Sequence, residues 1–331
     1  MRRRDKSKNT MLVLMGVIFI VLGLVCYLLG VLMGPLRLLA DNPGWWKALN
    51  EAAVWYSGVP IVIGITMVVV GLATTVNRKR KSKKLVFEPV TNQKLVVALT
   101  AYNDEESIFG AVEDFLSHPL VEKVIVVSNN STDKTIEEAG RAGAVVFNET
   151  VQGYGACVHR CLTEASQIEG YELVVLCEGD ATFRAYDIDK LMAYTPHADI
   201  VVGTRIVEQL QESDTQLSMF MHYGNFFVGK LLEMKHLGDV TLSDVGTTYK
   251  ICRSEILREV LPRLDKRVNL EFNPYFLDTL VGSGYKVVEC PISFHPRIGE
   301  SKGGNIDNSV ALKLGLRMIR GIIFGWRANV D

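Results

Sequence analysis

The chain has 331 residues, a formal net charge of −1 and a mean hydropathy of +0.17. The near-neutral charge argues against nucleic acid as the main partner, because proteins that bind nucleic acid neutralise its phosphates with Lys and Arg. The hydrophobic fraction of 48% is high for a soluble enzyme. This apolar excess is concentrated near the N-terminus.

Two uncharged apolar segments, 11–33 and 53–76, predict transmembrane helices. Each is at least as long as the roughly 20 residues that cross a bilayer core. A signal peptide would also follow basic residues such as Arg2 and Arg3, but its apolar region is shorter, and here a second span follows. We expect residues 1–84 to form a basic N-terminus, two transmembrane helices and a basic linker.

The flanking charges predict the orientation of this hairpin, because Lys and Arg are retained on the cytoplasmic side. Basic residues are dense at 2–8 and 78–84, whereas Arg37 and Lys47 are the cations of the loop between the spans. We therefore expect both termini, and everything after residue 84, to be cytoplasmic. The basic linker also suits anionic lipid headgroups.

Glycines recur every seven residues in the first span, at Gly16, Gly23 and Gly30, and again in the second, at Gly64 and Gly71. Small residues let helix backbones approach closely in lipid. The glycines therefore predict either packing of the two spans on each other or a homo-oligomer.

After the linker, short apolar segments alternate with helix-like ones. Strands are predicted at 94–100, 122–128, 144–147 and 173–177, with a helix at 155–166. Such alternation predicts an α/β fold with a mostly parallel sheet covered on both faces. Ligands of these sheets bind beyond the carboxyl ends of the strands.

The strand 173–177 is followed by two carboxylates, Glu178 and Asp180. In an extended segment alternate side chains share a face, so both could reach one Mg²⁺ or Mn²⁺ ion. An ordinary glycine turn would give the same sequence, so the metal assignment depends on the surrounding motifs.

The order of AYNDEE, SNNSTD, VQGYGA, EGD and VVGTR resembles glycosyltransferase family 2, which has the GT-A fold. SDVGTTYK and ECPISFHPRIGESK further resemble its polyprenyl-phosphate sugar transferases, the relatives of dolichyl-phosphate mannose synthase. The resemblance covers residues 94–303, and we assign 92–303 to the GT-A domain.

The resemblance implies a nucleotide site. Tyr102, Asn103 and Glu105 match the segment that contacts the nucleotide, and Asn129 and Asn130 replace an acidic pair near base and ribose. An amide offers both a donor and an acceptor, which suits uracil. A UDP-sugar is therefore slightly favoured over GDP-mannose.

The resemblance also places Gly153 and Gly155 in a turn before a helix beside the nucleotide, where glycine permits close approach. Glu178 and Asp180 match a metal-binding D-x-D motif, which implies Mg²⁺ or Mn²⁺ as cofactor. Glu178 departs from the usual Asp, and Thr182 stands where the family often has glutamine.

Four further residues match positions that bind the phosphates of donor and acceptor: Arg205, Arg297, Ser301 and Lys302. With Asp180, the three basic ones are the candidate catalytic residues. As alternatives, Arg297 and Lys302 could be solvated loop charges, and Arg205 could pair structurally with an acidic residue of a helix.

The last segment, 304–331, predicts an amphipathic interfacial helix, because Lys313, Arg317 and Arg320 interleave with apolar residues and Trp326 ends the pattern. A helix packed on the core of the domain would show a similar pattern.

These features predict an inverting, metal-dependent transfer of a hexose from a nucleoside diphosphate sugar to a polyprenyl phosphate at the cytoplasmic membrane face. An anionic phosphate needs positioning but no deprotonation. A hydroxyl acceptor, as in a glycolipid or polysaccharide synthase, would need a general base such as Asp244 or Glu271. An inactive membrane scaffold that retains the nucleotide-binding fold is the alternative from another class.

Overall fold

The computed structural model describes residues 4–39, 44–76, 87–299 and 308–326. The chain forms two compact units, which we call the helical unit (residues 1–83 with 234–237) and the sheet unit (residues 84–233 with 238–331).

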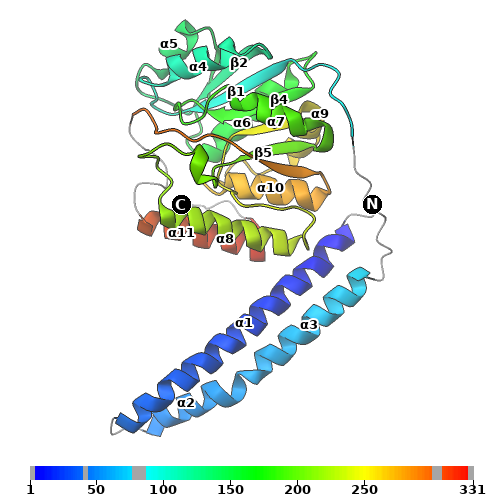
Figure 1. The fold of residues 1–331 in the computed structure, drawn as a ribbon, viewed down its shortest axis with the longest axis vertical. Coiled ribbons are helices and arrows are strands. Elements are labelled where there is room, and N and C mark those ends of the chain that lie inside the picture. The colour runs from blue at the N-terminus through cyan, green and yellow to red at the C-terminus, as the bar shows by residue number, and fades with distance from the viewer. Residues whose placement is uncertain (1–3, 40–43, 77–86, 300–307, 327–331) are drawn as a thin grey trace. The chain divides into compact units, whose positions relative to one another are not determined.

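The helical unit consists of α1 (Arg4–Leu39), α2 (Gly44–Tyr56) and α3 (Gly58–Val76), with α1 alongside α3 (Figure 1). Met11–Pro35 and Gly44–Ala73 are long and apolar enough to cross a membrane. The second candidate span therefore begins earlier than predicted. Only 22% and 17% of their most apolar windows are buried, so most of these apolar side chains are exposed, unlike those in the core of a soluble bundle.

Gly16, Gly23, Gly30 and Gly64 lie at contacts between the helices of this unit. A Cβ atom on Gly16 would lie 2.7 Å from the carbonyl oxygen of Gly64, and one on Gly23 would lie 2.7 Å from that of Ser57. Glycine is therefore needed here for close packing within the hairpin. A homo-oligomer through the same glycines stays a prediction.

The sheet unit is built on seven strands in the order β3-β2-β1-β4-β6-β5-β7. Strand β6 runs antiparallel to β4 and β5, and the other neighbours are parallel, which confirms the predicted mostly parallel sheet. The strands are β1 (Leu95–Ala101), β2 (Val121–Ser128), β3 (Val145–Asn148), β4 (Leu173–Glu178), β5 (Ile200–Thr204), β6 (Lys250–Arg253) and β7 (Val287–Pro291).

The four predicted strands correspond to β1–β4, each within one residue at either end, and the predicted helix is α6. The last three strands were not predicted. The helices of the sheet unit, except for the last two residues of α8, are α4 (Ile108–Ser117), α5 (Thr135–Arg141), α6 (Tyr154–Gln167), α7 (Asp187–Tyr194), α8 (Met219–Lys235), α9 (Ser254–Val260), α10 (Phe272–Ser283) and α11 (Asn308–Phe324). Single 3₁₀ turns lie at Thr195–His197, Glu208–Leu210 and Leu261–Arg263.

Every side chain of β1 is buried, because helices cover both faces of the sheet. On one face, Phe115 of α4 and Leu191 of α7 belong to the same buried cluster as Val97 of β1. On the other face α6 lies against β1, β2 and β4. This arrangement leaves the carboxyl ends of the strands as the accessible edge.

Helix α11 is part of the sheet unit and packs on α10. Met318 and Ile322 are buried, and the indole N–H of Trp326 donates to Asp278 Oδ2 at 2.6 Å. Leu312 and Leu316, by contrast, are 51% and 56% exposed. One side of α11 therefore contributes to the core while another presents apolar side chains outward, and its place at a membrane interface stays a prediction.

Candidate active site

The predicted site segments meet at one edge of the sheet. Thr100 of β1 pairs with Glu178 of β4, and Ala101 pairs with Ser128 of β2, so these three strands end side by side. The turns that follow contain three non-glycine residues with positive φ: Asn103 (51°), Asn130 (58°) and Ala181 (63°). Such strained residues cluster where a site needs a fixed backbone, which makes this edge the candidate site.

Asp180 lies at the centre of this edge and is only 3% exposed. Its Oδ1 accepts hydrogen bonds from the N–H and hydroxyl of Thr182, at 3.1 and 2.6 Å. Its Oδ2 lies 3.1 Å from Arg297 Nη1. The pKa of Asp180 is raised to about 7, first by burial and then by the charge of Glu178, while the charge of Arg297 acts in the opposite direction.

Arg297 also binds Asp104, a residue that sequence reasoning did not single out although it lies within AYNDEE. The distance from Arg297 Nη2 to Asp104 Oδ1 is 2.6 Å. Burial raises the pKa of Asp104, and the charge of Arg297 opposes this shift. The segment after β7 delivers Arg297 here because the N–H of Ile298 donates to the carbonyl of Asp180 at 3.3 Å.

Glu178, the other predicted metal ligand, is held by a hydrogen bond from the segment that precedes β6. The hydroxyl of Thr248 donates to Glu178 Oε1 at 2.5 Å. Thr248 is buried and lies in the SDVGTTYK motif. One oxygen of Glu178 is therefore fixed by the protein, and Oε2 is the oxygen that remains for a cation.

The nucleotide-side residues divide into structural and exposed ones. Asn129 is 4% exposed. Its Nδ2 donates to the carbonyl of Val151 at 2.8 Å, and its Oδ1 accepts from the N–H of Gly153 at 2.8 Å. It therefore shapes the loop before α6. Asn130 is exposed and is the member of the pair that a base could reach.

The turn after β1 is tied to the loop after β2. Asn103 Oδ1 accepts from the N–H of Thr132 at 2.8 Å, and Glu105 Oε2 accepts from the N–H of Lys134 at 2.9 Å. Tyr102 in the same turn is 37% exposed. Asn103 and Glu105 thus fix the turn, and Tyr102 presents a ring beside it.

The two glycines of VQGYGA are each required by the local structure, one by its backbone conformation and the other by packing. Gly153 has φ 144°, and a side chain there would be strained. A Cβ atom on Gly155 would overlap the carbonyl oxygen of Val268. The close approach expected at Gly155 is therefore made by another segment of the chain.

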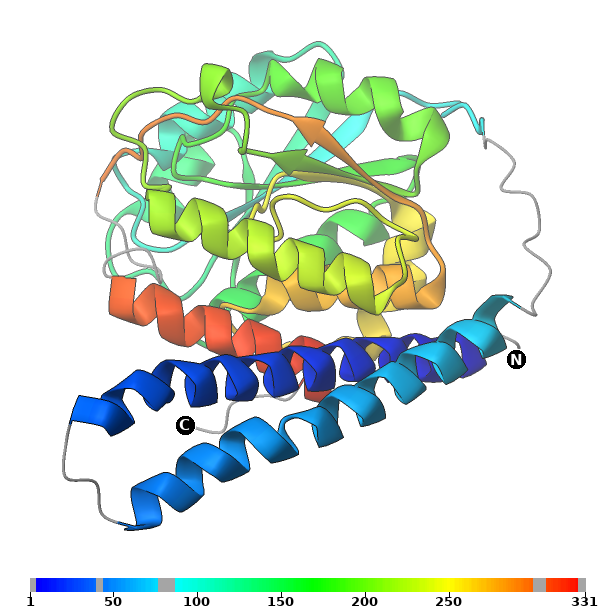
Figure 2. The ribbon, with the colours of Figure 1, turned by 60° about the horizontal axis from the view of Figure 1, so that its bottom comes forward.

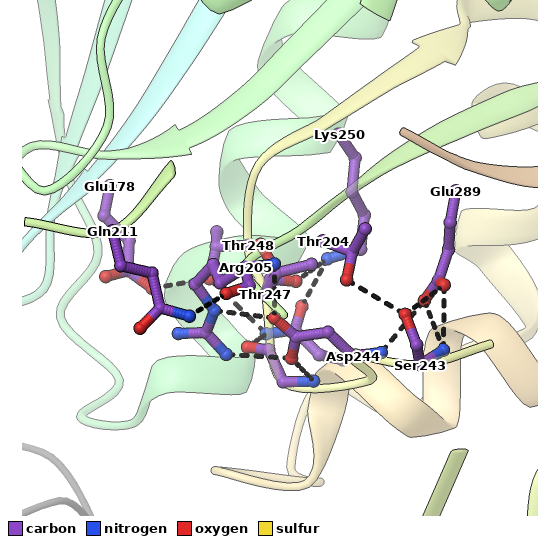
Figure 3. Close-up of polar contacts among 12 residues, drawn as sticks. Glu178, Thr204, Arg205, Gln211, Ser243, Asp244, Thr247, Thr248, Lys250 and Glu289 are labelled. Atoms are coloured by element: carbon purple, nitrogen blue, oxygen red, sulfur yellow. Dashed lines mark hydrogen bonds and ion pairs between the residues drawn. The ribbon is translucent and has the colours of Figure 1, made fainter. Parts of the chain in front are cut away.

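Arg205, predicted to bind phosphate, forms a buried ion pair. Its Nε and Nη2 lie 2.7 and 2.9 Å from Asp244 Oδ2 and Oδ1 (Figure 3). Burial alone would raise the pKa of Asp244, but Arg205 outweighs it and the pKa is lowered. Arg205 therefore has an acidic partner within the protein, as in the alternative, but that partner lies in the loop before β6 and not on a helix. Ser301 and Lys302 lie outside the described residues.

The donor set at this edge fits a divalent cation. The carboxylates of Glu178 and Asp180 lie close enough for the charge of one to raise the pKa of the other, and Asp180 Oδ2 already faces a cationic group. Within the described parts of the chain, no cluster of three or more His, Cys, Asp or Glu side chains could hold a metal alone. Phosphate oxygens would complete the coordination, as is usual for Mg²⁺.

Comparisons with known proteins show the family of the chain. Residues 96–261, half of the chain, match the model of glycosyl transferase family 2. An uncharacterised glycosyltransferase of Mycobacterium tuberculosis is 29% identical, covering 62% of this chain and 87% of its own. A dolichyl-phosphate hexose transferase of Haloferax volcanii is 25% identical over 63% of this chain and 86% of its own length. An undecaprenyl-phosphate mannosyltransferase of Micrococcus luteus is 24% identical over 66% of this chain and 91% of its own length.

Among solved structures, glucosyl-3-phosphoglycerate synthase from Mycobacterium tuberculosis in complex with Mn²⁺ and UDP-glucose has a TM-score of 0.50 and 16% identity, covering 71% of this chain and 80% of that one. This likeness shows the fold. The family match shows that the chain belongs to glycosyl transferase family 2, and the solved structure shows that it has the GT-A fold.

Proposed function

We propose that the protein transfers a hexose, with inversion at the anomeric carbon, from a nucleoside diphosphate sugar to a polyprenyl phosphate at the cytoplasmic face of a membrane. The observation that carries this proposal is the cluster of Glu178, Asp180 and Arg297 beyond the end of β4. It combines carboxylate oxygens for a metal with a cation for phosphate in a mostly buried setting, where electrostatic contacts are strong.

Each residue of the cluster has a role in this reaction. Glu178 Oε2 and Asp180 Oδ2 would hold Mg²⁺ or Mn²⁺, which when bound neutralises the charge of the departing diphosphate. Arg297 would turn from the carboxylates to a phosphate oxygen, because guanidinium binds both groups with the same geometry. Tyr102 and Asn130 are exposed beside the strand ends and would line the nucleotide.

The contacts of the candidate bases support an anionic acceptor. Asp244 is paired with Arg205, which lowers its pKa, and Glu271 lies 2.5 Å from Arg317 Nε. A carboxylate held in an ion pair is a poor general base at neutral pH. A phosphate acceptor needs no such base. Two of the relatives carry dolichyl phosphate and undecaprenyl phosphate in their names, which supports the same acceptor class.

Donor preference rests on fewer contacts. Because the amide of Asn129 is used within the protein, Asn130 carries the preference for a UDP-sugar over GDP-mannose. Its amide can pair with the adjacent donor and acceptor of uracil.

The membrane location is supported by both units. The helical unit exposes apolar side chains along two candidate spans. The sheet unit exposes apolar side chains on α8, with Tyr223 and Phe227 at 63% and 59%, as well as on α11. These two helices lie on the same side of the sheet unit (Figure 2). Aromatic side chains are typical of the membrane interface, where a lipid acceptor would be reached.

The proposal is tested by incubating the purified full-length protein with UDP- and GDP-sugars, Mg²⁺ or Mn²⁺ and a short polyprenyl phosphate. We expect a metal-dependent glycolipid whose anomeric configuration, read by NMR, is inverted relative to the donor. An Asp180→Asn variant is the control for metal-dependent chemistry. Nucleotide binding without transfer to any acceptor would instead support a scaffold that retains the fold.

A further inference from the structure

A buried chain of hydrogen bonds ends on Glu178. The hydroxyl of Thr248 lies 2.5 Å from both Glu178 Oε1 and the phenol oxygen of Tyr154. Asn273 Nδ2 donates to the Tyr154 oxygen at 2.9 Å, and Lys250 Nζ donates to Asn273 Oδ1 at 3.0 Å. Figure 3 shows Glu178, Thr248 and Lys250 among these contacts.

The direction of every bond in this chain can be assigned. An ionised Glu178 can only accept, so the hydroxyl of Thr248 donates to it. The Thr248 oxygen must then accept the proton of Tyr154, whose own oxygen accepts from the amide of Asn273. Because Lys250 can only donate, the chain runs in one direction from an ammonium group to a carboxylate.

The chain joins elements that are distant in the sequence. Tyr154 begins α6, Asn273 lies in α10 and Lys250 begins β6. Lys250 is fully buried, and its ammonium also donates to the carbonyl of Thr247. A lysine is rarely buried without a purpose for its charge, because desolvation of the ammonium is costly. Here the chain of hydrogen bonds connects that charge to the acidic site.

We infer that Thr248, Tyr154, Asn273 and Lys250 are positioning residues that fix Glu178 Oε1 and so present Oε2 to the metal. This inference rests on the proposed metal-dependent function. It also accounts for the glutamate: its side chain has one more rotatable bond than aspartate, so it needs outside support to hold a ligand geometry.

The experiment compares Mn²⁺ affinity, measured by electron paramagnetic resonance in the presence of UDP, between full-length wild type and three variants. Thr248→Val removes the hydroxyl at nearly constant volume, and Thr248→Ser retains it. Thr247→Val is the matched control, because the buried hydroxyl of Thr247 has no hydrogen-bond partner in the described part of the chain. Melting temperatures are recorded for all of them.

We expect Thr248→Val to weaken Mn²⁺ binding by about 10- to 100-fold, as is usual when the support of a ligand is lost. The Mn²⁺ affinities of Thr248→Ser and Thr247→Val should stay within about threefold of the wild-type value, because neither substitution removes that support. Tyr154→Phe should also weaken binding, and combining it with Thr248→Val should add little, because both break the same chain. If Thr248→Val lowers the melting temperature strongly, the Mn²⁺ affinity of Tyr154→Phe tests the inference instead.

Two failures are distinguishable. Wild-type protein that binds UDP but no Mn²⁺ would overturn the metal step of the proposed function, and the inference with it. Wild-type protein that binds Mn²⁺ with the same affinity as folded Thr248→Val and Tyr154→Phe would overturn the inference alone.

Discussion

Nη1 of Arg297 lies 3.1 Å from Asp180 Oδ2, and Nη2 of the same side chain lies 2.6 Å from Asp104 Oδ1. One guanidinium therefore occupies the oxygen of Asp180 that a metal would use. Its side chain is 13% exposed, so this pair is little screened by solvent. In the absence of donor, Arg297 and a divalent cation should compete for Asp180.

This competition predicts opposite effects of Arg297→Ala on metal binding and on transfer. Without nucleotide, Mn²⁺ affinity should rise roughly tenfold, because Asp180 loses a competing cation. Transfer should fall by about ten- to more than a hundredfold, because a charge-assisted phosphate contact is lost. Titration calorimetry measures the Mn²⁺ affinity, and an assay of sugar transfer measures the rate. Arg267→Ala, at an exposed pair with Asp265, is the control and should change neither. Unchanged or weaker Mn²⁺ binding by Arg297→Ala contradicts the competition.

A second prediction concerns Asp180 and pH. Its pKa is raised from 3.8 to about 7, so between these values the folded chain binds more protons than the unfolded chain. The free energy of unfolding therefore decreases as pH rises through this window. Asp180→Asn lacks this titration. In chelator, its melting temperature should exceed that of wild type by a margin that grows from about pH 4 to about pH 7.

The same variant should lose transfer by about 100-fold or more, since the metal's contribution to the barrier is several kcal/mol. A protein that is more stable and yet inactive would separate the function of Asp180 from folding. Turnover within a few-fold of wild type would remove Asp180 from the metal site.

The sequence allowed the framework of the fold to be predicted because β1, the second half of β2 and most of β4 are apolar segments, as is typical of buried parallel strands. It could not show which polar side chains meet. Asp104 and Arg297 are 193 positions apart, and their contact depends on how the segment after β7 crosses the sheet edge. The motif AYNDEE contained the signal for Asp104, but its partner was not visible.

Residue type was also a poor guide to whether a side chain is available. Asn129 was predicted to lie near the base and ribose, yet its side-chain amide forms hydrogen bonds with the loop before α6. Arg205 looked like a phosphate ligand, yet it pairs with Asp244. Both outcomes follow from burial, because a buried polar group must be satisfied within the protein.

Gly155 provides a test of packing without chemistry. Its Cβ position overlaps the Val268 carbonyl, so Gly155→Ala must displace backbone and should destabilise the protein by about 3 kcal/mol or more. Gly140→Ala is the matched control, since nothing lies near its Cβ position in α5 and alanine favours helix. A melting temperature of Gly155→Ala equal to that of wild type would show that the approach to Val268 is looser than described.

The orientation of the hairpin is predicted from its flanking charges. A cysteine introduced at Asn42, between the spans, should react with a membrane-impermeant maleimide in intact cells, whereas one at Ser82 should react only after the inner face is opened. Both positions lie outside the described residues. The reverse labelling pattern would place the sheet unit on the other side of the membrane.

The last prediction concerns the charge of the acceptor. If the nucleophile is a phosphate, wild-type protein should glycosylate polyprenyl phosphate and leave polyprenol and diacylglycerol unmodified, because only the hydroxyl acceptors need a base. Asp244→Asn should then act through stability: it leaves Arg205 buried without its counter-charge, which typically costs about 3–5 kcal/mol.

Removing both charges of that pair separates the two roles of Asp244. In the double variant Arg205→Met with Asp244→Asn, much of the stability lost in Asp244→Asn should return, because no uncompensated charge is buried. Activity toward polyprenyl phosphate should return with it if Asp244 only supports the fold. Rapid glycosylation of polyprenol by wild type, together with a double variant that is stable but inactive, would instead identify Asp244 as the general base of a hydroxyl-directed transferase.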